Sequence, residues 1–211
     1  MNKEDVKKAI EQLKKQPKRN FSQSYDLIIN LKNIVIKTTP VDFFVTLHHS
    51  KGKTVKVAAF VDNKMEEEAK KYCDLAINET EFVKYKDKTL KKLAEDYDYF
   101  IAQANLMPKV AAAFGRVLGV KGKMPNPKLG CVVPPSANLE PLVKKLNATA
   151  RLTAKKGSNL QCMVGKEDQP EEQIIDNILM IYQSTLKKLP NEAQNIKNIH
   201  LKLTMGKPII I

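Results

Sequence analysis

The chain has 211 residues, 43% of them hydrophobic, which is enough for one large or two small packed domains and excludes a disordered tail. Its 36 Lys and Arg against 23 Asp and Glu give a net charge of +13, which favours an anionic partner, nucleic acid before an acidic membrane. The three cysteines are dispersed, and no spacing typical of metal ligands occurs. No apolar run approaches the ~20 residues of a membrane span. These features predict a soluble, cytoplasmic protein without metal, cofactor or membrane partner.

The first part of the chain predicts one helix followed by two strands. Apolar residues recur at helical spacing after Asn2 until Pro17 ends the pattern. Residues 21–31 alternate between apolar and polar, which is typical of a half-buried strand, and 42–47 read as a second strand. A polar, glycine-containing loop follows at 48–53.

From Val55 the pattern changes to strands and helices in alternation. Short apolar runs of the kind found in parallel sheets alternate with amphipathic segments, which predicts a three-layer, Rossmann-like α/β domain. The expected strands are 55–61, 75–77 and 99–102, and the expected helices are 64–73, 88–97, 106–118 and a last one from Ser136 or Asn138 to about Leu146.

The last part of the chain returns to β structure. Strands are predicted at 149–154 and 160–164 with a turn at 155–159, then a long helix from Pro170 and a strand from Ile199 to Met205 that Gly206 stops. A terminal strand needs a partner from earlier in the chain. We therefore predict the fold class α/β, with an α+β split domain from 1–53 and 149–211 and an inserted Rossmann-like domain at 54–148.

The stretch 119–130 (GVKGKMPNPKLG) is the most unusual internal segment. Its two prolines and three glycines exclude a helix or a central strand, and no acidic residue occurs between Tyr99 and Leu139. A rigid basic loop of this kind suits a phosphate backbone. It supplies a candidate second RNA contact at Lys121, Lys123, Asn126 and Lys128.

Enzyme motifs fit poorly. The 119–130 loop is not a phosphate-binding Walker loop, because Val117 stands where that motif needs glycine and Met124 where it needs Ser or Thr. No G-x-G-x-x-G or G-x-S-x-G occurs either. A nucleotide-binding enzyme that uses the inserted domain remains an alternative, but the residues favour a binding protein.

The terminal domain carries the features of an RNA-binding surface. Its basic residues would flank a common face if the terminal strands form one sheet, and Phe21 either stacks on a base or packs in the core. The hydroxyl of Thr204 and the bare backbone of Gly206 allow close approach, and mixed contacts of this kind suit shaped RNA.

Three stretches together resemble the family of the L-one stalk protein of the large ribosomal subunit: 19–24 (RNFSQS), the 119–130 loop and 203–206 (LTMG). The resemblance covers nearly the whole chain, and the form of 19–24 is similar to archaeal members. It differs at His48 and Ser50, where the family usually has Pro and Gly, at Val120, which replaces a common Pro, and at Lys207, which intervenes before Pro208.

The resemblance implies a non-enzymatic ribosomal protein, monomeric within the ribosome, that binds large-subunit rRNA. It also implies a mobile stalk near the exit site for deacylated tRNA and repression of translation through the protein's own mRNA. A free translational regulator that never enters the ribosome is the alternative. The RNA-binding positions that it implies are Phe21, Ser24, Thr204, Met205 and Gly206, together with Arg19, Gln23, Lys53 and Lys166.

Overall fold

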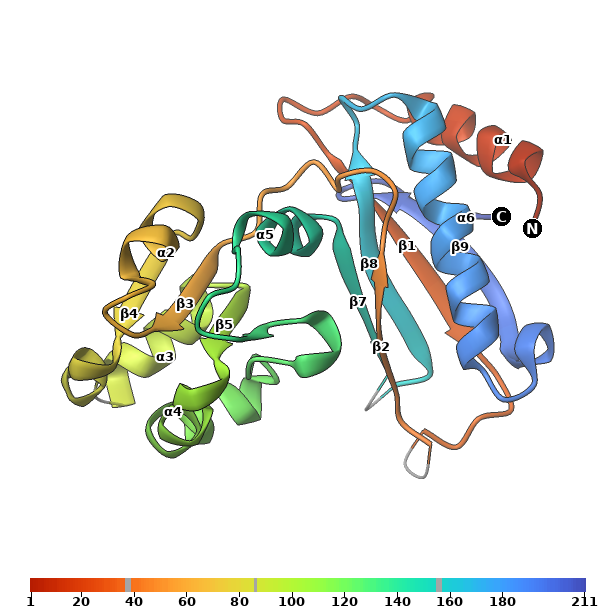
Figure 1. Ribbon diagram of the computed structural model, residues 1–211. Helices are drawn as coiled ribbons and strands as arrows, with labels where there is room; N and C mark the ends of the chain where they lie inside the picture. The colour runs from red at the N-terminus through yellow and green to blue at the C-terminus, as the bar shows by residue number, and fades with distance from the viewer. Residues whose placement is uncertain (37–38, 86, 155–156) are drawn as a thin grey trace. The chain divides into compact units, whose positions relative to one another are not determined.

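The computed structural model describes residues 1–36, 39–85, 87–154 and 157–211 (Figure 1). Lys155 and Lys156 of the predicted turn lie outside the described residues. The chain divides into two compact units, Met1–Lys53 with Ala148–Ile211 and Thr54–Asn147, which we call the terminal unit and the inserted unit. Ala148 belongs to the terminal unit, where its carbonyl accepts a hydrogen bond of 2.8 Å from the Leu47 amide. The predicted α/β fold class is confirmed.

The terminal unit is built on a four-stranded antiparallel sheet with the order β10-β9-β1-β8. Figure 1 shows α6 lying along this sheet, and a second, two-stranded sheet pairs β2 with β7. The elements are α1 (Lys3–Lys14), β1 (Ser24–Leu31), β2 (Val41–Thr46), β7 (Thr149–Ala154), β8 (Asn159–Lys166), α6 (Glu171–Lys188), a 3-10 turn η4 (Glu192–Asn195), β9 (Ile196–Leu203) and β10 (Ile209–Ile210).

The core of the terminal unit follows the periodicities of the sequence. Alternate residues of β1 are buried, and Val6, Ile10 and Leu13 place one side of α1 in the same core cluster, together with the apolar side of α6. Both ends of the chain therefore contribute to one hydrophobic core.

Several strand boundaries differ from the prediction, and two of them shape the surface described below. β1 begins at Ser24 rather than Phe21, because Ser22 bonds to the Asp168 side chain and Gln23 turns inward, so that Phe21 is 51% exposed. β9 ends at Leu203, and Met205, predicted on the buried face, is 61% exposed in the turn that follows. The chain then reverses into β10, which makes β9 an internal strand rather than an edge strand.

The inserted unit has a parallel sheet with the order β4-β3-β5-β6. Figure 1 shows α3 and α4 on one side of this sheet and α2 and α5 on the other. The elements are β3 (Val57–Val61), α2 (Glu66–Tyr72), β4 (Leu75–Asn78), η1 (Glu79–Lys84), α3 (Asp87–Asp96), β5 (Tyr99–Gln103), η2 (Ala104–Leu106), α4 (Met107–Lys121), η3 (Pro127–Leu129), β6 (Val132–Val133) and α5 (Glu140–Asn147).

The core of the inserted unit on the α3 and α4 side is aromatic. The rings of Phe60, Phe82 and Phe114 lie within 5.7 Å of one another, centroid to centroid, and Phe100 stacks on Phe60 at 5.8 Å. The short strand β6 was not predicted, since two residues carry too little periodicity. The prediction of a non-helical 119–130 stretch is wrong at its start, because α4 continues to Lys121 and ends on Gly122, whose φ is 65°.

Candidate RNA-binding surface

One edge of the terminal sheet brings together both ends of the chain. β1 starts at Ser24, β8 ends at Lys166 and β9 ends at Leu203, and because the strands are antiparallel these points are neighbours. Ser24 pairs with Lys166 across one ladder, and Tyr25 pairs with Leu203 across the other. The predicted positions Phe21, Ser24, Lys166 and 204–206 therefore lie at one edge, which we call the Thr204 edge.

Thr204 continues the ladder between β1 and β9 by one residue. Its backbone amide donates to the Ser24 carbonyl at 3.1 Å, and its Oγ1 accepts from the Ser24 amide at 3.0 Å. The hydroxyl of Thr204 also donates a long hydrogen bond of 3.4 Å to the Ser24 carbonyl oxygen. Because this bond is long and the side chain is exposed, the hydroxyl can rotate its proton to an outside acceptor.

Gln23 supports the turn at the Thr204 edge from within. Its side chain is only 2% exposed, and its Oε1 accepts a 3.1 Å hydrogen bond from the Met205 amide. Its carbonyl accepts from the Glu167 amide at 2.9 Å. Gln23, predicted among the RNA-binding residues, thus offers its side chain to Met205 rather than to a ligand.

Apolar side chains stand exposed at the same edge. Phe21 and Met205 precede β1 and follow β9, and they are 51% and 61% exposed. Exposure decides between the two interpretations of Phe21, because a half-exposed ring outside the core clusters is available for stacking. Met205 beside it supplies a soft, adaptable apolar surface.

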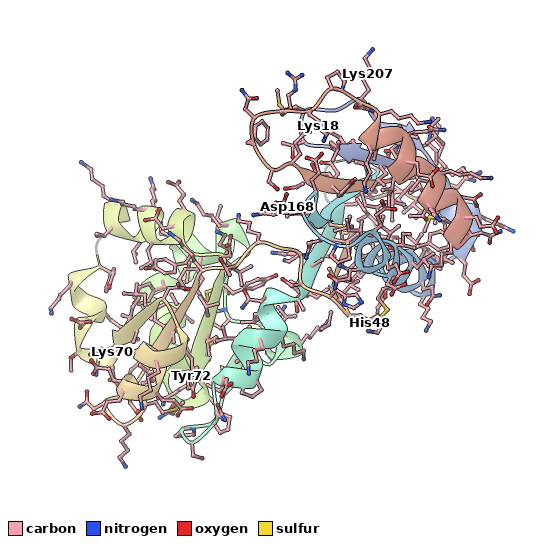
Figure 2. All side chains as sticks on the ribbon, turned by 90° about the horizontal axis from the view of Figure 1, so that it is seen from above. Lys18, His48, Lys70, Tyr72, Asp168 and Lys207 are labelled. Atoms are coloured by element: carbon pink, nitrogen blue, oxygen red, sulfur yellow. The ribbon has the colours of Figure 1, made fainter. Side chains whose placement is uncertain are left out.

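The positive charge of the chain is concentrated in the terminal unit. It has 20 Lys and Arg against 11 Asp and Glu, whereas the inserted unit has 16 against 12. Arg19 and Lys53 are exposed, Lys166 is half-buried, and Figure 2 shows Lys18 and Lys207 projecting from this unit. These groups would serve as counter-charges for phosphates around the Thr204 edge.

Gly52 fixes the approach of the 48–53 loop to this edge. Its φ is 75°, a conformation that favours glycine, and a Cβ there would lie 3.1 Å from Lys166 Cγ and 3.2 Å from Gln169 Oε1. The loop thus packs directly on the end of β8. Lys53, at the next position, is the last residue of the terminal unit before the inserted one.

The candidate second contact in the inserted unit is largely occupied by internal bonds. Lys121 pairs with Glu95 at 2.9 Å and holds the pKa of that carboxyl below its usual value, and Lys123 donates to the Tyr97 carbonyl at 2.7 Å. The Asn126 side chain accepts from the Lys128 amide at 2.9 Å and so caps the turn η3. Lys121 and Lys128 are both exposed, and Lys128 lies within the turn η3.

The usual ligand position of a parallel α/β sheet is filled in this protein. That position lies at the carboxyl ends of neighbouring strands, here β3 and β5. Gln103, which is fully buried, donates to Asp62 Oδ1 at 3.2 Å and accepts from the Asp62 amide at 3.1 Å. Asn78 donates to Glu66 Oε2 at 2.9 Å. These polar groups satisfy one another, and their two carboxylates disfavour a nucleotide phosphate.

Other kinds of site find little support in the described ranges. No group of three or more His, Cys, Asp or Glu that could hold a metal ion occurs in residues 1–36, 39–85, 87–154 and 157–211. Burial raises the pKa of the Cys73 thiol to about 11, so this cysteine is a poor nucleophile. No helix within these ranges combines the length and the apolar character that crossing a membrane requires.

Comparisons with known proteins converge on one family. The model of the ribosomal protein L1p/L10e family matches residues 13–207. The chain is 37% identical to large ribosomal subunit protein uL1 of Nanoarchaeum equitans over 205 residues, which cover 94% of this chain and 96% of that protein. It is 37% identical to the uL1 protein of Hyperthermus butylicus, covering 98% and 95%, and 36% identical to that of Pyrococcus abyssi, covering 97% and 94%.

Proposed function

The chain belongs to the ribosomal protein L1p/L10e family, and we propose that it binds large-subunit rRNA through the Thr204 edge of its terminal unit. The family membership makes it a structural, RNA-binding protein of the large ribosomal subunit, of archaeal type, and not an enzyme. The residue-level assignment is our proposal, and it concerns Phe21, Ser24, Thr204, Met205 and Gly206, with Arg19, Lys53 and Lys166 around them.

The observation that carries this proposal is the bond between Ser24 and Thr204. It brings an exposed hydroxyl, two exposed apolar side chains and the backbone of Gly206 to one edge of the sheet. RNA that is folded into a defined shape is recognised through ribose hydroxyls, splayed bases and backbone, which need this mixture of groups. Arg19, Lys53 and Lys166 add charge for phosphates.

We extend the proposal to the role of the protein in the ribosome. The terminal unit would anchor the protein on rRNA, and the inserted unit would form the head of a mobile stalk near the exit site for deacylated tRNA. The lower charge of the inserted unit and the internal pairing of Lys121 and Lys123 support a head that contacts RNA less strongly than the anchor. Lys128 is the residue best placed for a tRNA or rRNA contact in that head.

We further propose that the same edge binds the protein's own mRNA and so represses its translation. A single edge serving both RNAs predicts competition between them. A fragment of the large-subunit rRNA should displace the mRNA leader from the protein, because both would occupy Thr204 and Met205. Simultaneous binding of both RNAs would mean separate sites and would overturn this part of the proposal.

Sedimentation tests the proposal at the level of the cell. Native protein should migrate with large subunits at low salt and leave them as salt is raised, because lysine contacts to phosphates release counterions. The Thr204→Val variant should leave at lower salt than the Thr153→Val control, which changes an exposed threonine of β7. Protein that stays in the soluble fraction at every salt concentration would favour a free regulator.

A further inference from the structure

Two loops of the Thr204 edge lie beyond the ends of the strands, and side-chain carboxamides hold them. The first loop is the turn 204–207 after β9, and the second is the loop 48–53 after β2. Ladder hydrogen bonds stop where the strands stop, so the shape of these loops depends on other partners. Gln23 supplies one such partner at Met205, and two further glutamines, Gln16 and Gln169, supply others, although the sequence does not single them out.

Gln16 binds the turn 204–207 in the manner of a neighbouring strand. Its Oε1 accepts from the Lys207 amide at 2.9 Å, and its Nε2 donates to the Lys207 carbonyl at 3.0 Å. A Cβ at Gly206 would lie only 2.6 Å from the same Oε1, so a larger residue there would force the Gln16 carboxamide to move. Gln16 follows α1, which packs on the core through Val6, Ile10 and Leu13, and the turn is thereby fixed to a rigid element.

Gln169 ties the loop 48–53 to the end of β8. Its Oε1 accepts from the Lys166 amide at 2.8 Å, and its Nε2 donates to the Ser50 carbonyl at 2.9 Å. Gly52 packs against this side chain, with a Cβ position 3.2 Å from Oε1. One side chain thus joins the loop that contains Lys53 to the end of β8, where Lys166 lies.

We propose that Gln16 and Gln169 are positioning residues of the RNA-binding edge, each holding one loop in the shape that binds RNA. The inference rests on the proposed function of the Thr204 edge. Neither glutamine needs to touch RNA for this role. Each supplies a donor and an acceptor to backbone groups at once, and each thereby removes an ordering cost that RNA binding would otherwise carry.

The choice of a carboxamide follows from its two kinds of polar atom. A methionine has a similar length but replaces both the donor and the acceptor with an apolar chain end. A glutamate keeps the acceptor and, when ionised, sets a second oxygen against the carbonyl that the glutamine NH₂ bonded. Methionine therefore tests the positioning role without adding charge, which a glutamate next to RNA would do.

The test measures affinity of the full chain for a large-subunit rRNA fragment. Gln16→Met should weaken binding about tenfold, since two hydrogen bonds that order the turn are lost. Gln12→Met is the matched control, because Gln12 is exposed one turn earlier on α1, and it should bind within twofold of wild type. Gln169→Met should weaken binding similarly, with Gln173→Met on α6 as its control.

A double-mutant cycle separates positioning from general destabilisation. If Gln16 acts through the turn, then in a Thr204→Val background Gln16→Met should cost less than twofold, because the turn's main contact is already gone. A full tenfold loss in both backgrounds would mean that Gln16 acts elsewhere and would overturn the inference. Thermal unfolding of each variant, compared with wild type, verifies that the fold is kept.

The outcomes also distinguish this inference from the proposed function. If wild-type protein fails to bind the rRNA fragment, the proposed function itself is wrong. If wild type binds and both methionine variants bind within twofold of it, the Thr204 edge stands and the positioning role is wrong. A loss of RNA affinity in Gln16→Met or Gln169→Met, together with a non-additive effect of Gln16→Met and Thr204→Val, supports both the proposed function and the positioning role.

Discussion

The hydroxyl of Thr204 gives the sharpest test of the RNA-binding edge. Thr204→Val keeps the β-branching and the approximate size of the side chain and replaces the hydroxyl with a methyl group. In the free protein this removes the 3.0 Å bond from the Ser24 amide, which leaves that amide to water. We expect a loss of about 0.5–1.5 kcal/mol in the free energy of unfolding, the usual net worth of one such bond.

The effect on RNA affinity should be larger. The Ser24 carbonyl keeps its 3.1 Å bond from the Thr204 amide, so the hydroxyl can exchange its long 3.4 Å bond to that carbonyl for a bond to an RNA oxygen. A lost bond to a ribose or phosphate oxygen, with its partner left buried, costs about 1–3 kcal/mol. Since 1.4 kcal/mol is tenfold, binding should weaken by about 5- to 150-fold.

The assay is a binding titration with a large-subunit rRNA fragment at fixed salt, with Thr204→Ser as the rescue variant and Thr153→Val as the control on β7. Serine keeps the hydroxyl and should bind nearly as well as wild type. A folded Thr204→Val protein with wild-type affinity would refute the reasoning. So would a serine variant as weak as the valine one, because the methyl group would then carry the effect.

Three further predictions follow from the same structure. The affinity for RNA should fall as the salt concentration rises. A plot of log affinity against log salt concentration should have a slope of about −3 if Arg19, Lys53, Lys166 and Lys207 each meet a phosphate, and Lys166→Ala should reduce that slope by about 1. An affinity that does not change with salt would contradict this prediction. Gly206→Ala should weaken RNA binding at least as much as Gln16→Met. The alanine Cβ would lie only 2.6 Å from Gln16 Oε1 and would displace it. Wild-type affinity of this variant would show that the turn adapts. Tyr25→Phe should reduce the loss of stability between about pH 10 and pH 12. Burial raises the pKa of Tyr25 to about 12, so above pH 10 the unfolded wild type releases a Tyr25 proton that the folded protein retains, and the variant lacks this contribution. Denaturant titrations at pH 8 and pH 11 measure this difference, and equal pH dependence in both proteins would refute it.

The periodicity of apolar residues in the sequence was sufficient to predict most of the helices and strands. Apolar residues recur with a period of two over 24–31 and with a period of 3.6 over 3–14. Each period identifies the buried face of its strand or helix, and both faces pack in the same core. What periodicity misses is the end of an element. β1 stops being a strand before Ser24 because the side chains of Ser22 and Gln23 find partners in Asp168 and Met205, which lie 146 and 182 residues away. Such partners have no local signal.

The RNA-binding surface was likewise predicted only in part. The RNA-binding positions came from resemblance, and the structure adds which of them point outward. Gln23 and Asn126 have polar side chains that look suitable for RNA in the sequence, yet both are used to hold backbone amides. Lys121 and Lys123 look free in an acid-poor stretch, but Glu95 and the Tyr97 carbonyl come from the end of α3 and the residue that follows it. Composition along the chain cannot reveal partners that the fold brings in.

The position of the edge explains why a split domain suits an RNA anchor. Ser24 and Thr204 are 180 residues apart in the chain, and the bond between them exists only when β1 and β9 are paired. Gln16 and Lys207 add a second link of 191 residues, also between the two ends. RNA that binds across these links favours the closed terminal unit over any state in which the last strand is detached. Binding should therefore protect the Thr204 and Lys207 amides from hydrogen exchange more than amides of α4, and equal protection in both places would contradict this coupling.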